Sequence, residues 1–373
     1  MTQTDPFYKK STVILFGFIL LVYVLFTLAD ILVPIAFSVL IAILLNPLNS
    51  RFQRVRIPKV LSILLTLLVA LTALGLLLYF LSSQIAQFGE MVPILKQKFT
   101  QILTDLQHWA ERTFGIGIQK QTQILKDAAN SSKAVVGRTV SSALGIFSLL
   151  FLIPVYIFLL LYYKPLILNF LFEVFSHKNT QSVADILHET KSAIQSYIVG
   201  LLIEASIVAV LNSVALTLLG VKYGILLGVI GAILNMIPYI GGLIAIILPV
   251  LMATVTKEGY TTQLAIIGAY AVIQFIDNNI LVPRIVSSKV QLNALVSILA
   301  VLLGGALWGF AGMFLSIPFV AVIKIICDRI EELQPWGKLL GDQVPANYPG
   351  QISPSQNSPS KTDKTEINIV RQE

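Results

Sequence analysis

Long apolar runs separated by short polar stretches make up most of the chain. A helix needs about 20 apolar residues to cross the hydrocarbon core of a bilayer. Six runs have about that length and two further apolar regions are longer, at residues 11–29, 31–48, 60–83, 139–163, 195–219 and 260–282, and at 224–255 and 292–327. The pattern predicts an all-α polytopic membrane protein with about eight membrane segments.

The first two runs are almost continuous with each other. The run at 11–29 follows Lys9 and Lys10, but its apolar stretch is too long for the core of a cleaved signal peptide. Because the run at 31–48 follows directly, we expect the two to form a tight helical hairpin. Residues 1–83 then make an N-terminal unit of a short tail and three spans.

Polar stretches mark the parts expected outside the membrane. Residues 84–138 are too polar to span, and their apolar positions from Val92 to Trp109 recur at alternating steps of three and four, which predicts an amphipathic helical arm. This arm packs on the membrane domain, on another subunit or on lipid, and the sequence leaves these three alternatives open. Residues 139–194 are expected to hold the fourth span and interfacial amphipathic helices, and 328–373 a cytoplasmic, mostly disordered tail.

The two longest apolar regions share a pattern of glycines and proline. In both, glycines spaced by four and three precede an Ile-Pro-aromatic triplet: Gly224, Gly228, Gly231 and 237–239, then Gly305, Gly309, Gly312 and 317–319. The match indicates an internal repeat of about 80 residues. Pro238 and Pro318 disturb the preceding helical turn, and Gly241-Gly242 strengthens the expected break in the first region.

Broken backbone at membrane depth survives only where protein or water satisfies its polar groups, and paired broken segments point to a transporter's binding site. We therefore expect 224–255 and 292–327 to be re-entrant hairpins, each following a span, so that 195–327 forms a transport core of two inverted repeats. Arg284 and Lys289 would then be cytoplasmic. A single crossing by 224–255 is the alternative, and it places both bases outside.

Polar side chains inside the spans are costly and therefore point to function. Two helical faces carry them: Tyr197, Gly200, Glu204 and Asn212 on one, and Tyr270, Gln274 and Asp277 on the other. These stripes predict a hydrated seam, in which Glu204 either carries an ion or is a protonated packing residue. Asp277 is either part of the seam or a helix-end residue beside Arg284, because Pro283 is expected to end its helix near Val282.

Composition narrows the functional class. The chain has 12% charged residues, a mean hydropathy of +0.82 and a net charge of +7. In a membrane protein such bases set orientation and contact lipid headgroups, so nucleic-acid binding is not predicted. The single cysteine, Cys327, excludes a disulfide framework and a cysteine-based zinc site. The sequence holds no nucleotide-binding motif or catalytic constellation, so we expect no cofactor, metal site or enzymatic activity.

Three C-terminal stretches carry a resemblance to a known family. They are LNMIPYIGGLIAIILPVLMA at 234–253, DNNILVPRIV at 277–286 and GGALWGFAGMFLSIPFVAVIKI at 304–325. In this order they resemble the autoinducer-2 exporter family of bacterial permeases, and the similarity extends over nearly all of the chain up to about residue 342. The resemblance implies eight membrane segments in the bacterial cytoplasmic membrane, homo-oligomers and export of small solutes. Some relatives are linked to the signal autoinducer-2 and others to sodium–proton antiport.

The expected function is that of a secondary transporter exporting a small polar solute, an autoinducer-2-like signal or related metabolite, with coupling to H⁺ or Na⁺. A sodium or lithium ion–proton antiporter and a non-transporting membrane scaffold are the alternatives. The expected transport path comprises Glu204, Asn235, Pro238, Gly241, Gly242, Gln274, Asp277, Asn278, Pro283, Arg284, Gly304, Gly305 and Pro318. In particular, we expect Asp277, Asn278 and Arg284 to line one polar site that attracts an anionic or oxygen-rich solute.

Overall fold

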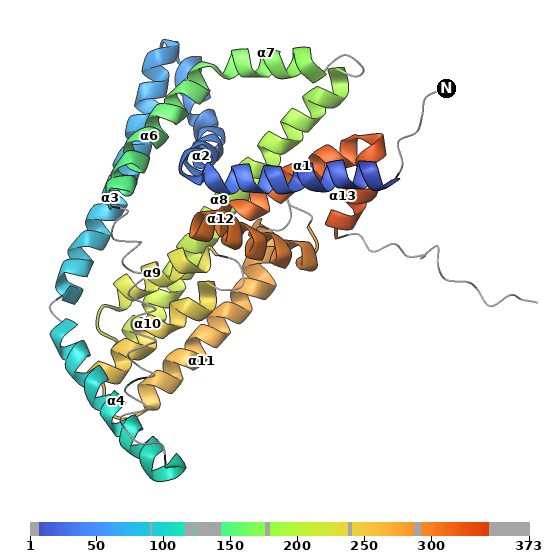
Figure 1. Cartoon of the computed structure of the whole chain (residues 1–373). Coiled ribbons are helices and arrows are strands. Elements are labelled where there is room, and N and C mark those ends of the chain that lie inside the picture. The colour runs from blue at the N-terminus through green and yellow to red at the C-terminus, as the bar shows by residue number, and fades with distance from the viewer. Residues whose placement is uncertain are drawn as a thin grey trace, which may run out of the picture.

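The computed structural model describes residues 7–89, 92–115, 123, 143–175, 180–237, 241–286 and 292–342. Over these residues the chain is helical, and the extended pairing found there is one isolated bridge between Leu292 and Gly341 (Figure 1). The helices are α1 (Phe7–Thr27), α2 (Ala29–Arg54), α3 (Lys59–Gly89), α4 (Val92–Phe114), α6 (Ala143–Tyr162), α7 (Lys164–Phe175), α8 (Thr180–Leu218), α9 (Gly224–Asn235), α10 (Gly241–Thr256), α11 (Thr261–Ile276), η1 (Asp277–Val286), α12 (Ala294–Arg329), η3 (Glu331–Leu333) and α13 (Gln334–Leu340).

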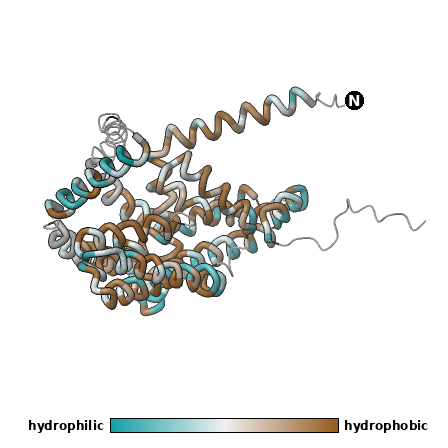
Figure 2. The backbone as a smooth tube through the Cα atoms, turned by 90° about the horizontal axis from the view of Figure 1, so that it is seen from below, coloured by the Kyte–Doolittle hydropathy of each residue, from teal (hydrophilic) through white to brown (hydrophobic). Residues whose placement is uncertain are grey.

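The helix lengths and apolar content fit a polytopic membrane protein. Five helical stretches meet the requirements of a span on their own, in α2, α3, α8, α11 with η1, and α12. The α6–α7 pair qualifies as a sixth but bends by 63°, and α1, α9 and α10 are apolar but shorter. Figure 2 shows the apolar residues along these helices, with the polar positions concentrated toward their ends and in α4. Counting α9–α10 and α12 as one segment each gives the predicted eight.

The expected tight hairpin between the first two spans is wrong. One residue, Leu28, separates α1 from α2, and α1 runs away from α2 and across α12 (Figure 1). The chain bends without reversing because Leu28 donates its N–H to the Val24 carbonyl and accepts from the Leu32 N–H, so helical hydrogen bonding continues through the junction. The indole N–H of Trp308 holds α1 by donating to the Leu25 carbonyl at 2.9 Å.

The N-terminal spans pack on α6 to form one wall of the protein. A small core of apolar residues joins α2, α3 and α6 around Ile63 and Ile157, which are almost fully buried. The described part of the predicted amphipathic arm is helix α4, which contacts α10. Residues 90–91, 116–122 and 124–138 of that arm, residues 139–142 of the predicted fourth span, and the predicted tail from 343 lie outside the described residues.

Helix α8 is the central element of the C-terminal half. It begins at Thr180, so the stretch expected to be a separate interfacial helix before residue 195 is continuous with the span. Its apolar face packs through Tyr197 and Leu201 against Leu40 of α2 and Leu315 of α12. Helix α8 also contacts α9, η1 and α11, which places it between the N-terminal wall and the rest of the predicted transport core.

The first broken segment is a helical hairpin. At 1.5 Å per residue α9 is about 18 Å long and α10 about 24 Å, so neither crosses a core of about 30 Å. The two helices pack on each other. Pro238 itself lies outside the described residues. The start of α10 is so close to α9 that a side chain on Gly241 would meet the Leu234 carbonyl.

The second broken segment is also a hairpin, because α12 consists of two helical arms joined at a kink. Trp308 and Gly309 have non-helical backbone angles, and the φ of Gly309 is +60°, a value that favours glycine. A side chain on Gly304 would meet the backbone of Gly312, and the reverse also holds. Residues eight apart in a straight helix are about 12 Å apart along its axis, so the arms 294–307 and 310–329 fold back on each other.

The chain therefore reverses at Gly309 and not near Pro318, which lies buried inside the second arm of α12. Each half of the predicted core has the same order of elements. A long helix, α8 or α11 with η1, is followed by a hairpin, α9–α10 or α12. Which side of the membrane each hairpin enters from stays a prediction.

Candidate transport site

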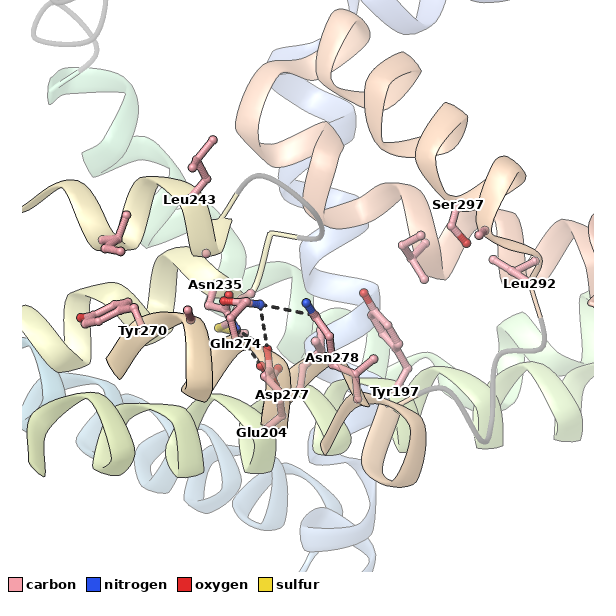
Figure 3. A pocket seen from close by; sticks show the side chains of 18 of the residues that line it. Tyr197, Glu204, Asn235, Leu243, Tyr270, Gln274, Asp277, Asn278, Leu292 and Ser297 are labelled. Atoms are coloured by element: carbon pink, nitrogen blue, oxygen red, sulfur yellow. Dashed lines mark hydrogen bonds between the residues drawn. The ribbon is translucent and has the colours of Figure 1, made fainter. Parts of the chain in front are cut away.

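Two acids from different helices meet at the hairpin formed by α9 and α10. Glu204 comes from the middle of α8 and Asp277 from the start of η1, and each is 2% exposed. Asn235, the last residue of α9, lies between them. Its Nδ2 atom donates to Glu204 Oε1 at 3.1 Å and to Asp277 Oδ2 at 2.8 Å (Figure 3). We call these three residues the carboxyl–amide cluster.

The π-helix η1 positions one of the two acids. Pro283 was expected to end the helix near Val282, but the helix widens at Asp277 and continues to Val286. A π-helix closes i→i+5 hydrogen bonds and is rare outside functional sites. Just before η1, Gln274 donates to Asp277 Oδ2 at 3.4 Å and to Asn278 Oδ1 at 3.3 Å. The amides of Gln274 and Asn278 therefore lie next to the cluster.

One oxygen of the cluster lacks a conventional donor. Asp277 Oδ1 is buried and has no hydrogen-bond partner among the described residues, if both acids are taken as ionised. The Glu204 carboxyl group lies within hydrogen-bonding reach of Asp277. Two ionised carboxylates in contact and away from water repel each other strongly. A proton on Glu204, or a cation between the two groups, would remove that repulsion and complete the coordination of Asp277.

The tip of the first hairpin presses on this cluster through Gly242. A side chain at that position would collide with Gln274 Oε1 and would come within 3.0 Å of Asn235 Oδ1. Glycine allows the start of α10 to approach the polar side chains this closely. The hairpin tip and the carboxyl–amide cluster are therefore one packed unit.

A cavity of about 870 Å³ opens beside the cluster. Its lining comes from α8, the first hairpin, α11, η1, both arms of α12 and the segments next to α12 and α13. It comprises Tyr197, Leu201, Glu204, Asn235, Met236, Gly242, Leu243, Ile246, Ile267, Tyr270, Ala271, Gln274, Asp277, Asn278, Val282, Leu292, Ala294, Ser297, Ile317 and Asp342. Figure 3 shows Ser297 and Leu292 at one end, with Tyr197 between them and the acids. A volume of this size is typical of sites that hold small organic molecules.

Six of the predicted path residues line this cavity: Glu204, Asn235, Gly242, Gln274, Asp277 and Asn278. Gly241, Gly304, Gly305 and Pro318 are outside the lining and pack within the two hairpins. Pro283 and Arg284 are exposed, and neither lines the cavity. Pro238 lies outside the described residues.

The expectation that Arg284 shares a polar site with Asp277 is wrong, and the structure records no ion pair between these two described residues. In an α-helix, positions seven apart return to nearly the same face. The wider turn of the π-helix puts them on nearly opposite faces. Arg284 therefore points away from the acid.

Sequence analysis missed the lining residues at the open end of the cavity. Leu292 precedes α12, Ser297 lies in the first turn of α12, and Asp342 follows α13. Asp342 reaches the cavity because Gly341 pairs with Leu292 in the isolated bridge. No periodic pattern in the sequence connects positions 292 and 342, so no signal there could have joined them.

With this geometry established, comparisons with known proteins identify the family. A family model described as "AI-2E family transporter" matches residues 13–332. The chain belongs to the AI-2E transporter family. One relative of this AI-2E transporter is the AI-2 transport protein TqsA of Escherichia coli (strain K12), which is 28% identical over 319 residues that cover 84% of this chain and 90% of TqsA.

Two further relatives of the AI-2E transporter have similar coverage. YhhT of Escherichia coli (strain K12) is 26% identical over 86% of this chain and 91% of its own length, and YrrI of Bacillus subtilis (strain 168) is 25% identical over 79% and 85%. The relatives are bacterial, and the helices described above are long and apolar enough for several crossings. The AI-2E transporter is thus a multi-pass protein of the bacterial inner membrane.

Proposed function

We propose that this membrane transporter is an ion-coupled secondary transporter that exports a small polar solute through the cavity between α8, the first hairpin, η1 and α12. The observation that carries the proposal is the carboxyl–amide cluster at the buried end of that cavity. A buried acid pair needs a proton or a cation to cancel its charge. Binding of a proton or a cation to the acid pair and binding of the solute in the cavity would therefore influence each other.

The name of one relative suggests a solute. TqsA is named an AI-2 transport protein, and an autoinducer-2-like signal or a related metabolite is our first candidate for this chain. The cavity volume of about 870 Å³ supports a solute of metabolite size. Oxygen-rich solutes would find hydrogen-bonding groups in Asn235, Gln274 and Asn278.

A sodium or lithium ion–proton antiporter is the second candidate. It is favoured by the contact between Glu204 and Asp277, because such a pair can exchange one proton for one monovalent cation with no organic solute. The two candidates differ in one measurable respect. In the antiporter a sodium gradient alone moves protons, whereas in the solute exporter neither protons nor sodium ions cross until a solute is supplied.

Proteoliposomes that contain the full chain and a trapped pH-sensitive dye test both candidates. An imposed sodium gradient is applied first without solute and then with trapped autoinducer-2. We expect solute efflux that depends on the proton or sodium gradient, and loss of that dependence in Glu204→Gln and in Asp277→Asn. Glu173→Gln, an exposed acid of α7, is the matched control. Gradient-dependent efflux that survives in both cluster variants would refute the coupling role.

We also propose that the protein is a homo-oligomer in contact with membrane lipids. Helix α1 supports this, because its apolar side chains from Val13 to Phe26 are mostly exposed and it projects from the body (Figure 2). In a bilayer such a surface is covered by lipid or by another subunit. Native mass spectrometry of the full chain released from nanodiscs tests the proposal, and a monomer at every protein concentration would contradict it.

A further inference from the structure

The charges that line the cavity are all of one sign. Glu204, Asp277 and Asp342 are acidic, and none of the described lining residues is Lys, Arg or His. A low-dielectric cavity with acids alone attracts cations and repels anions. This contrasts with the expectation from sequence, which included Arg284 and an anionic solute.

The remaining lining indicates a solute with an apolar body. Aliphatic side chains surround the acids on several elements: Leu201, Met236, Leu243, Ile246, Ile267, Val282, Leu292 and Ile317. Two buried tyrosines, Tyr197 and Tyr270, add aromatic rings to the same cavity. Aromatic faces attract ammonium groups in addition to apolar surface. A bare alkali ion occupies a small fraction of about 870 Å³, so the lining fits an organic cation better.

The acids lie at two depths. Asp277 is 2% exposed, and its Oδ1 is one of the few buried polar atoms of the described residues without a partner. Asp342 is exposed and therefore lies where the cavity meets solvent. The structure records no ion pair for Asp342 among the described residues. Lys324 lies against neighbouring Gly341, but its ammonium group is paired with Asp328.

A single asparagine fixes the segment that carries Asp342. Asn293 caps α12, because its Oδ1 accepts from the Val296 N–H at 2.8 Å. Its Nδ2 donates to the carbonyls of Leu339 at 2.7 Å and Gly341 at 3.1 Å. Its backbone N–H donates to a third carbonyl of the same segment at 3.1 Å. Asn293 thus fastens the end of α13 to the start of α12 and holds Asp342 beside the cavity.

We propose that the cavity binds a monovalent organic ammonium, and that Asp342, positioned by Asn293, is the residue at its open end that selects cations over neutral and anionic solutes of the same shape. This inference rests on the proposed ion-coupled export and, among small polar solutes, names a cationic class in place of the autoinducer-2-like candidate. Asp342 would act by long-range attraction at the solvent edge. Asp277 and Glu204 would meet the charge at the buried end.

Three compounds of nearly the same shape separate charge from size. Choline carries a permanent positive charge, 3,3-dimethylbutan-1-ol replaces its nitrogen by carbon and is neutral, and 3,3-dimethylbutanoate is anionic. Binding of each to the full chain in nanodiscs is measured by isothermal titration calorimetry at low ionic strength. We expect choline to bind at least about 10-fold more tightly than the neutral alcohol, since Asp342 and an acid pair with one ionised carboxylate face the cavity. The anion should bind least.

Two variants with a matched control identify the selecting residue. Asp342→Asn should weaken choline binding about 3-fold, the size expected for one exposed charge pair, and leave the alcohol unaffected. Asn293→Ala should act in the same direction by releasing Asp342. Glu332→Gln is the control, because this acid precedes α13 and does not line the cavity. The effect of Asp342→Asn should shrink at about 1 M salt, where screening is strong.

Several outcomes would overturn the inference. Equal binding of choline and the alcohol, no binding of choline, or an identical effect of Asp342→Asn and Glu332→Gln each contradict it. The ion-coupled export described above has its own readout, the gradient dependence in proteoliposomes. Coupled efflux of a neutral solute would leave the proposed function standing and refute the selection of cations. Choline binding without gradient-dependent efflux would support the inference and refute the coupling.

Discussion

Asn235→Leu tests the carboxyl–amide cluster most directly, because one amide serves both acids. The substitution keeps the branching and the number of heavy atoms of the side chain and removes two hydrogen bonds, at 3.1 Å to Glu204 and 2.8 Å to Asp277. A hydrogen bond to a neutral group contributes about 1 kcal/mol and one to a charged group about 1.5–3 kcal/mol. With one acid of the pair ionised, the expected loss in the free energy of unfolding is about 3 kcal/mol.

The same loss should depend on pH with a defined sign. At low pH both acids are protonated and the amide makes two neutral bonds, so the loss falls to about 2 kcal/mol. At higher pH one bond is to a carboxylate and the loss is larger. The difference between Asn235→Leu and the unsubstituted protein should therefore grow as pH rises. Unfolding of the purified protein in detergent, followed by intrinsic fluorescence across pH, measures both quantities.

Asn212→Leu is the control for this experiment. Asn212 is also a buried amide, at 2% exposure on α8, but no hydrogen bond to either acid is recorded for it in the described structure. Its substitution should change the unfolding free energy by an amount that does not vary with pH. If Asn235→Leu costs less than about 1 kcal/mol, or if its cost is as independent of pH as that of Asn212→Leu, the amide does not hold an ionisable pair.

Three further predictions address packing around the site. Gly242→Ala should destabilise the protein by about 1–3 kcal/mol and slow transport, since its side chain would strike the amides of Gln274 and Asn235. Gly268→Ala is the control, because its side chain meets no atom within 4 Å and the substitution should be neutral or stabilising. Unfolding curves and transport rates compare the two variants. Trp308→Phe should lose about 1 kcal/mol through its missing bond to α1, measured by unfolding, and an unchanged midpoint would contradict that role. Arg329→Gln should leave the unfolding midpoint unchanged, because its pairs with Glu189 and Asp185 are solvent-exposed; a large drop would show that these pairs hold α8 to α12.

The hydrophobic pattern predicted the number and the class of the elements well because both depend on local properties. Twenty apolar residues in a row have few alternatives to a membrane helix. The positions at which the chain reverses within the broken segments were harder to predict. In the second broken segment Gly304, Gly305, Gly309 and Pro318 were all credible breaks, and the chain turns at Gly309 because this is where positive φ lets the two arms meet. Only contact between the arms distinguishes that position.

The difference between local properties and contacts between distant segments also explains which site residues were predicted from the sequence. Glu204 and Asp277 were identified because acids inside apolar spans are rare and costly. Arg284 was expected beside Asp277 because Pro283 was expected to end the helix near Val282, whereas the helix continues to Val286 with π geometry, a change that has no local signature that we recognise. Asp342 was missed because its position depends on hydrogen bonds made by Asn293, nearly fifty residues earlier.

The arrangement of the cluster constrains how the core can move. Asn235 belongs to the first hairpin, whereas the two acids belong to α8 and η1, so one amide ties three elements together. The tip of the second hairpin is tied elsewhere, to α1 through Trp308. A rearrangement that separates the first hairpin from α8 must break both bonds of Asn235 and leave the acids without their donor. That step is least costly when the pair has gained a proton or a cation, because no uncompensated charge is then exposed to the low-dielectric core. The state of the acid pair would therefore decide when the first hairpin can move, and this is the physical link between an ion and a solute that coupled transport requires.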